Sequence, residues 1–459
     1  MSVISSALLR VTPLFLFLAP ADVTNLPSNA DAKPPIALDK VTPYKEVAGR
    51  AKVQKSSAYT FVNKGSGQVK TVLMGVDLSF NGELVELQKN FLKEFCSRNP
   101  QSKVILLYDP RCNINNIKKS LTDIVVLKNV CLIQTKEGQS YRWTQDPVVF
   151  LNNPDKNEIV ALSNANCSFP KALLDSNIVS NVITPANSNV LIDGGDFRAI
   201  AGPDGPILII GLERKLMGKS RDPKSVIAVI SEYINEFSLY GFRPENIIFR
   251  GGNPDEITFN QALKNMPQEE LQFLHPSIFI MGDQEIPTKS FIGYHSDLQI
   301  FETGIRDKKE RPILMISKPL ILYDKHFQAL LSNTKNEEEK LQLRQSQKWW
   351  NNIYEKENKR YIDRGFSVRP LPFGEITKKD DRGVCLVNYT NVVSNTNLNK
   401  KREIYLPVQG NDHYFDVEAI NVYRNVYGNS ADIIPVIGSE QMGPDCGLLN
   451  CLFNVVERQ

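Results

Sequence analysis

Four side chains that could act together on a guanidinium group are spread over three distant segments of the chain. Cys451 offers a thiol, His295 an imidazole, and Asp146 and Asp297 offer carboxylates. A thiolate attacks electron-poor carbon, and a histidine transfers protons near neutral pH. A carboxylate pairs bidentately with a planar guanidinium. If folding brings them together, these four groups predict attack on the central carbon of a guanidinium.

Each motif taken alone has a plainer explanation. Asp146 ends the segment Arg142-Trp143-Thr144-Gln145-Asp146, ahead of the apolar run 148–150, and a loop-capping role before Pro147 would suffice. If residues 294–297 form a strand, His295 and Asp297 share one face, because alternate side chains do. Cys451 stands in an apolar segment, where a cysteine is usually buried and structural. A reactive thiol needs nearby positive charge, which a bound cationic substrate could supply.

Composition describes an ordinary globular protein. The chain has 459 residues, of which 42% are hydrophobic and 23% charged, with a net charge of +3. That charge is too small to predict nucleic-acid binding. Its seven cysteines include no CxxC pair, and its four histidines include no HExxH motif, so neither a disulfide framework nor a metal-dependent hydrolase is expected. No metal is expected.

Short β-branched runs alternate with amphipathic helical runs. Strands are expected at 71–76, 103–108, 124–127, 206–211, 247–250, 277–281, 312–316 and 433–437. Apolar residues at helical spacing predict helices over 84–95, 226–234 and 417–426. This alternation predicts one layered α/β domain over residues 1–459. Two insertions are expected within it, an extended loop at 25–66 and a charged surface helix at 335–364.

The motifs together resemble the protein-arginine deiminase family, within the guanidine-modifying pentein superfamily. That family carries R-W-x-Q-D, H-x-D and G-x-x-H-C-x-T-N-V in this order. Here the corresponding segments are RWTQD at 142–146, HSD at 295–297 and GLLNCLFNV at 447–455. Residues 9–14 resemble the L-R-V-x-P stretch that opens the catalytic domain, and Gly194-Gly195-Asp196 resembles a loop that lines pentein active sites.

The resemblance implies a five-bladed, pseudo-symmetric α/β propeller with a central site. Asp146 and Asp297 would hold the guanidinium, Cys451 would attack its carbon, and His295 would protonate the leaving ammonia. Water would then hydrolyse the thiouronium intermediate, giving citrulline from an arginine-containing protein or peptide without a metal in the chemical step. Further substrate contacts are expected from Trp143, Gly195, Asp196 and Asn450.

Two departures from the family pattern stand beside the nucleophile. Asn450 replaces the family's histidine, and Phe453 replaces its threonine. A third departure concerns calcium, which some relatives bind through acidic residues directly after R-W-x-Q-D. Here Pro147, Val148 and Val149 follow, and apolar side chains cannot coordinate a cation that prefers oxygen ligands. We therefore expect neither a cofactor nor calcium activation through that site.

Two other functions remain open. The substrate could be a small guanidine such as agmatine or free arginine, and the departures at Asn450 and Phe453 also fit a pentein binding protein that has lost catalysis. No membrane partner is expected, because the apolar run 13–21 is too short to span a bilayer. We interpret that run as a first strand, and together with the unpaired cysteines this predicts a cytoplasmic protein. Read as a signal peptide instead, the run would end after Ala21. Asn388-Tyr389-Thr390 is an N-glycosylation sequon, relevant only to a secreted protein.

Overall fold

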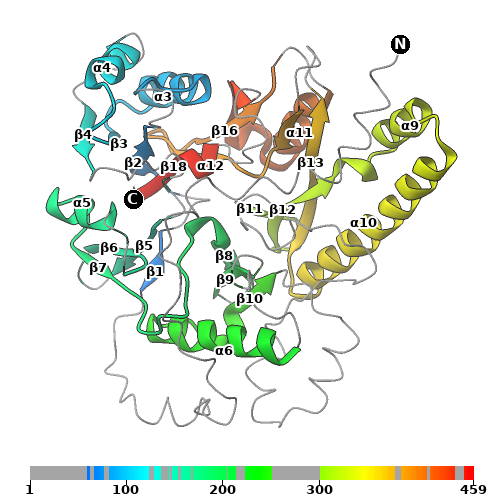
Figure 1. Ribbon diagram of the computed structural model, residues 1–459, viewed down its shortest axis with the longest axis horizontal. Coiled ribbons are helices and arrows are strands. Elements are labelled where there is room, and N and C mark those ends of the chain that lie inside the picture. The colour runs from blue at the N-terminus through cyan, green and yellow to red at the C-terminus, as the bar shows by residue number, and fades with distance from the viewer. Residues whose placement is uncertain are drawn as a thin grey trace.

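The computed structural model describes the chain in segments between Tyr59 and Arg458 (Figure 1). The described residues are 59–62, 67–76, 82–122, 129–135, 144, 147–153, 156, 158–165, 167, 169–203, 205–212, 215, 223–250, 300–377, 384–410, 414–439 and 449–458. At 223–224, 349, 375–377, 384–386 and 450 only the backbone is described.

Within these residues the strands form five sheets, and every sheet contains the same ββαβ unit. A first strand pairs antiparallel with a second, and the second pairs parallel with a third. A helical crossover joins the second and third strands, as parallel pairing requires. The units are β5 (Val149–Asn153), β6 (Glu158–Leu162), α5 (Phe169–Asp175) and β7 (Asn181–Ile183); β8 (Phe197–Gly202), β9 (Gly205–Gly211), α6 (Pro223–Leu239) and β10 (Ile247–Arg250); β11 (Ile300–Arg306), β12 (Pro312–Pro319), α9 (Asp324–Asn333), α10 (Glu337–Asp363) and β13 (Ser367–Thr377); β15 (Val393–Thr396), β16 (Arg402–Val408), α11 (Tyr414–Tyr427) and β17 (Ala431–Ile437); and β18 (Phe453–Arg458), β2 (Val69–Gly75), α3 (Glu86–Arg98) and β3 (Lys103–Tyr108).

Three sheets have an additional strand at an edge. The short β1 (Thr60–Phe61) pairs with β5, and β14 (Val384–Asn388) pairs with β13. The strand β4 (Val130–Gln134) follows helix α4 (Ile114–Thr122) and pairs parallel with β3. These strands extend the repeated unit without changing its order. In Figure 1, α5, α6 and α10 lie toward the outline of the molecule, while β18 lies nearer its middle.

One unit is assembled from both ends of the described chain. Its first strand, β18, pairs antiparallel with β2, and Phe453 lies opposite Met74 in the register. The side chains reinforce the pairing, because the Thr71 hydroxyl donates to Glu457 Oε2 at 3.4 Å. The strand that follows Cys451 is therefore fixed to the beginning of the described fold.

Five hydrophobic clusters join the units in chain order. One cluster connects the β5 and β8 units, the next connects β8 with β11, and two more connect β11 with β15 and β15 with β18. The fifth cluster packs the β18 unit against the β5 unit. Alternate side chains of a strand enter different clusters, as in β5, where Leu151 and Phe150 belong to different ones. Each sheet is thus covered by apolar neighbours on both faces.

Most elements expected from the sequence are confirmed. Strands β2, β3, β9, β10, β12 and β17 overlap six of the expected strand segments, with ends within three residues of the expected ones, and α3, α6 and α11 overlap the three expected helices, α3 beginning two residues late. The expected strands at 124–127 and 277–281 lie outside the described residues, as do the run at 9–14 and the apolar stretch 13–21. The α/β class is confirmed, and the described strands form several small sheets.

The two expected insertions have different outcomes. Of residues 25–66 only 59–62 are described, and they contain β1, so the extended loop stays a prediction. The charged stretch 335–364 forms the 27-residue helix α10, whose Ile353, Tyr354 and Tyr361 pack into the cluster between the β8 and β11 units. Among the described helices, none combines the length and the apolar character needed to cross a bilayer.

Candidate active site

Cys451 lies in a single helical turn directly before the last described strand. The turn, α12 (Leu449–Leu452), ends where β18 begins. Its neighbours Leu449 and Leu452 are fully buried in the core, which fixes the turn, and Cys451 itself is 1% exposed. The thiol does not face apolar groups alone, however. It contacts a polar side chain from a different unit.

That polar side chain is Asn391, which the sequence did not single out. Its Nδ2 donates to Cys451 Sγ at 3.2 Å, and its Oδ1 accepts from the Cys451 backbone N–H at 3.4 Å. Asn391 is completely buried and stands two residues before β15. One amide therefore holds the cysteine by both its backbone and its sulfur.

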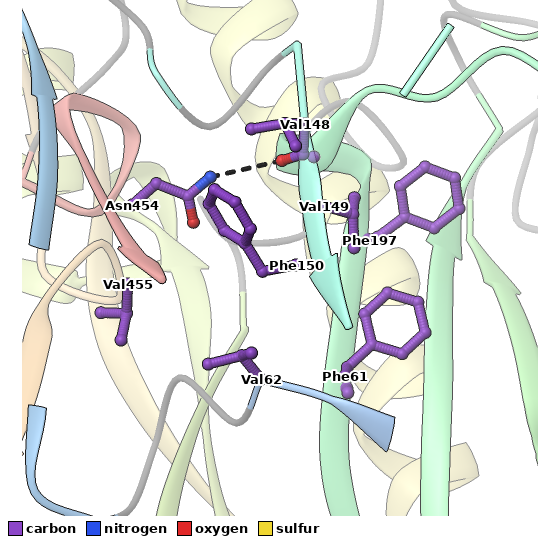
Figure 2. Close-up of a pocket in the computed structure, with 10 residues that line it drawn as sticks. Phe61, Val62, Val148, Val149, Phe150, Phe197, Asn454 and Val455 are labelled. Carbon is purple, nitrogen blue, oxygen red and sulfur yellow. Dashed lines mark hydrogen bonds between the residues drawn. The ribbon is translucent and has the colours of Figure 1, made fainter. Parts of the chain in front are cut away.

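The RWTQD segment is fastened to the same turn. The Thr144 hydroxyl donates to the Leu452 carbonyl at 3.0 Å, next to the cysteine. In return, Asn454 Nδ2 donates to the Thr144 and Val148 carbonyls, each at 3.3 Å. Figure 2 shows the second of these bonds crossing from β18 to the beginning of β5. Thr144 and Val148, which stand on either side of Asp146 in the sequence, are therefore both hydrogen-bonded to β18, the strand that follows Cys451.

Several predicted site residues lie outside the described residues. They are Trp143, Asp146, His295 and Asp297, and for Asn450 only the backbone is described, within α12. Their roles stay predictions. The described residues contain no cluster of three or more His, Cys, Asp or Glu arranged to hold a metal ion.

Gly195 and Asp196 lie in a short 3₁₀ turn, Gly194–Asp196, directly before β8. The Asp193 carboxylate caps this turn by accepting from the Gly195 N–H at 3.2 Å. Asp196 is fully buried and pairs with Lys215 Nζ at 2.5 Å, and Lys215 is itself only 4% exposed. The ammonium of Lys215 also lies 4.8 Å from the centre of the Phe197 ring, where a cation is attracted to the π face. Asp196 is thus already engaged by a cation of the protein.

The candidate segments share one position in the repeated unit. Cys451, Asn391 and Asp196 stand two, two and one residues before the first strands of their units, because β18 starts at Phe453, β15 at Val393 and β8 at Phe197. In the sequence, Asp146 and Asp297 likewise precede Val149 and Ile300, the first residues of β5 and β11. Every unit therefore carries a candidate residue just before its first strand.

A pocket with about 330 Å³ of empty space, open solvent included, lies beside Val148, Gly194 and Asn454. Its walls come from β1, β5, β8, β18 and residues next to them, and they are mainly apolar. In Figure 2, Phe150 lies near Asn454, whereas Phe61 and Phe197 lie on the other side of β5. An apolar wall cannot compensate a guanidinium charge. This pocket is therefore packing space beside the site and does not itself form a cation-binding site.

Two further residues singled out in the sequence are buried in the fold. The Phe453 ring packs 4.0 Å from Phe91, centre to centre, so this side chain is part of the core. The sequon residue Asn388 is 1% exposed, and its Oδ1 accepts from both the N–H and the hydroxyl of Thr390. A buried asparagine cannot receive a glycan in the folded protein.

A second group of buried charges links several units. Burial raises the pKa of Glu302 in β11, while its hydrogen bond to the Ala201 backbone and three nearby arginines act in the opposite direction. Those arginines are Arg198, Arg402 and Arg458. The net shift remains upward, so the protein environment disfavours the carboxylate despite its cationic neighbours.

Comparison with known proteins gives weak similarities. No family model matches the chain, and no curated protein matches it. A protein provisionally assigned as an arginine deiminase from Porphyromonas gingivalis is 10% identical, with a TM-score of 0.47, over 86% of this chain and 97% of that one. A provisionally assigned agmatine deiminase is 12% identical at the same TM-score, over 87% and 96%. An amidinotransferase of saxitoxin biosynthesis from Microseira wollei is 10% identical, with a TM-score of 0.36, over 88% and 98%. At these values the similarities do not establish a shared fold or activity.

Proposed function

We propose that this protein is a guanidine-modifying hydrolase that uses Cys451 as its nucleophile. The observation that carries the proposal is a set of three hydrogen bonds between residues 144–148 and residues 452–454, directly after Cys451. Thr144 binds the Leu452 carbonyl, and Asn454 binds the carbonyls of Thr144 and Val148. A thiol and the segment that contributes Asp146 are hundreds of residues apart in the chain and are nevertheless held against each other.

The repeated unit supports a central site. We propose that the five units close into a five-bladed ring, because five apolar clusters connect them in order and return from the β18 unit to the β5 unit. In such a ring the residues before all first strands would lie at the same end. His295 and Asp297, which precede β11, would then face Cys451.

The chemistry proceeds in two balanced steps. The Cys451 thiolate forms a C–S bond with the guanidinium carbon, and one C–N bond breaks as His295 gives a proton to the departing ammonia. Water then attacks the thiouronium carbon while His295 accepts one of its protons. The C–S bond breaks to restore the thiolate, and the second proton of the water leaves to solvent, where it converts the released ammonia to ammonium. The products are ammonia and a ureido group, which is citrulline when the substrate is arginine. Asp146 and Asp297 hold the cation through paired hydrogen bonds.

The proposed substrate is an arginine side chain within a protein or peptide. The test is release of citrulline or ammonia from an arginine blocked at both its amino and carboxyl groups, beside free arginine and agmatine. Turnover of the blocked arginine supports a peptidyl substrate, whereas turnover of agmatine or free arginine alone assigns a small guanidine. Absence of turnover with all three, while a known deiminase works in the same assay, refutes the enzyme.

The nucleophile is tested separately with a haloacetamidine, which carries a guanidinium-like head. Wild-type protein should be labelled at Cys451, and Cys451→Ala should not. Cys96→Ala is the matched control, because Cys96 lies in α3 and burial raises its pKa to about 12. Equal labelling of wild type and Cys451→Ala would show that the sulfur is structural.

A further inference from the structure

Asn391 presents its amide to Cys451 in an orientation that the protein itself fixes. The backbone N–H of Cys451 is only a donor, so the Asn391 atom facing it, at 3.4 Å, must be the oxygen. The nitrogen then necessarily faces the sulfur, at 3.2 Å. Sulfur accepts a hydrogen bond much better as a thiolate than as a thiol, because the donor then meets a full negative charge.

The loop that carries Asn391 is braced from both sides. The hydroxyl of the preceding Tyr389 donates to Asp416 at 2.6 Å, and the Tyr389 carbonyl accepts from the Tyr423 hydroxyl at 2.7 Å. Asp416 also accepts from the backbone N–H groups of residues 409 and 410. Tyr389, Asp416 and Tyr423 are all buried. A donor held by this many contacts keeps its direction without further reorganisation, which is what stabilisation of a developing charge requires.

We propose that Asn391 is a catalytic residue that stabilises the Cys451 thiolate and fixes the direction of its attack. The role of Asn391 in catalysis rests on the proposed function, whereas its effect on the ionisation of the Cys451 thiol does not. The geometry divides its two atoms between two tasks. The Nδ2–H group stabilises the anion, and Oδ1 holds the backbone of α12 so that the sulfur keeps its place before β18.

Two substitutions separate the donor from simple packing. Asn391→Asp keeps the shape and the acceptor for the Cys451 N–H but replaces the donor by a second acid, so two negative charges would have to form side by side. Asn391→Ala removes both bonds. Asn395→Ala is the matched control, because Asn395 is equally buried four residues along the same segment and bonds instead to Val69 N–H and Glu403.

The readout is the rate of Cys451 alkylation by iodoacetamide against pH, followed by peptide mass spectrometry on protein that shows a cooperative urea transition. Asn391→Ala should move the midpoint of this profile upward by about one pH unit, equivalent to roughly tenfold less thiolate at a given pH. Asn391→Asp should move it further, and Asn395→Ala should leave it in place. If Asn391→Ala does not fold, the nearly isosteric Asn391→Asp carries the comparison.

Coincident midpoints for wild type and the Asn391 variants would overturn the inference. Citrulline release is measured on the same preparations. A midpoint that moves in protein without any deiminase activity would refute the proposed function and leave the role of Asn391 intact. If wild type releases citrulline but the alkylation midpoint is the same in wild type and the Asn391 variants, the proposed function stands and the role of Asn391 is refuted.

Discussion

Replacement of Asn454 by alanine should damage activity more than stability. Its Nδ2 makes two hydrogen bonds of 3.3 Å, to the Thr144 and Val148 carbonyls on either side of Asp146. A buried hydrogen bond contributes about 1 kcal/mol net, and both bonds are long, so the expected loss of unfolding free energy is about 1–2 kcal/mol. The RWTQD segment would keep its bond from Thr144 to Leu452 but lose its second attachment.

The effect on catalysis follows from the position of that attachment. A displacement of about 1 Å in a substrate-binding group can lower the rate about 100-fold, because orientation is lost in the transition state. We therefore expect kcat/KM for blocked arginine to fall by roughly 10- to 100-fold. Steady-state citrulline release gives this value, and urea unfolding gives the stability on the same sample.

The matched control is Asn153→Ala. Asn153 is also 2% exposed and ends β5, the strand that Asn454 anchors at its beginning. Its Oδ1 accepts one long bond, from the Lys156 N–H at 3.4 Å. If Asn454→Ala and Asn153→Ala have the same kcat/KM within about twofold, the attachment of the RWTQD segment to β18 is structural only and the reasoning fails.

Three further outcomes are expected. Phe453→Ala should lower the unfolding free energy by roughly 3–5 kcal/mol in urea titration, since it empties a fully buried site against Phe91, and a loss below about 1 kcal/mol would contradict the core assignment. In the folded protein the pKa of Glu302 lies above its ordinary value of 4.5. The contribution of Glu302 to the unfolding free energy is therefore most favourable below pH 4.5 and is lost as pH rises through the raised pKa. The stability of Glu302→Gln relative to wild type should accordingly increase from pH 4.5 to about pH 8. Urea midpoints at both pH values test this, and a constant difference would contradict it. Burial raises the pKa of Cys96 to about 12, so only about one molecule in ten thousand should carry the Cys96 thiolate at pH 8. At that pH iodoacetamide should label Cys96 in urea-unfolded protein but not in native protein. Rapid labelling of Cys96 in native protein, detected by peptide mapping, would show that burial does not protect the thiol.

The sequence predicted local elements well because they depend on local patterns. The helices with clear apolar spacing, such as α3 and α11, appear where they were expected. The repeated unit was not visible in the sequence for a physical reason. Its crossover helices range from the 7 residues of α5 to the 27 of α10, so no fixed period connects equivalent strands.

The site was only partly predictable. Cys451 and the RWTQD segment carry recognisable residue types, and the structure attaches the two segments to each other through Thr144 and Asn454. Asn391 gave no comparable signal, because its contact with Cys451 joins residues 60 positions apart through loop geometry. The one available indication was its place before Val392-Val393, which matches the place of Asp146 and Pro147 before Val148-Val149.

The pairing of β18 with β2 also determines when the fold can be completed during synthesis. The Thr71–Glu457 contact joins residues 386 positions apart, so β2 must wait for nearly the whole described chain to leave the ribosome before it finds its partner. Contacts of such long sequence separation form late and slowly. A nascent chain that stops before Phe453 cannot anchor the RWTQD segment to β18. The restraint on the segment around Cys451 is therefore completed only after Cys451 and β18 have both been synthesised.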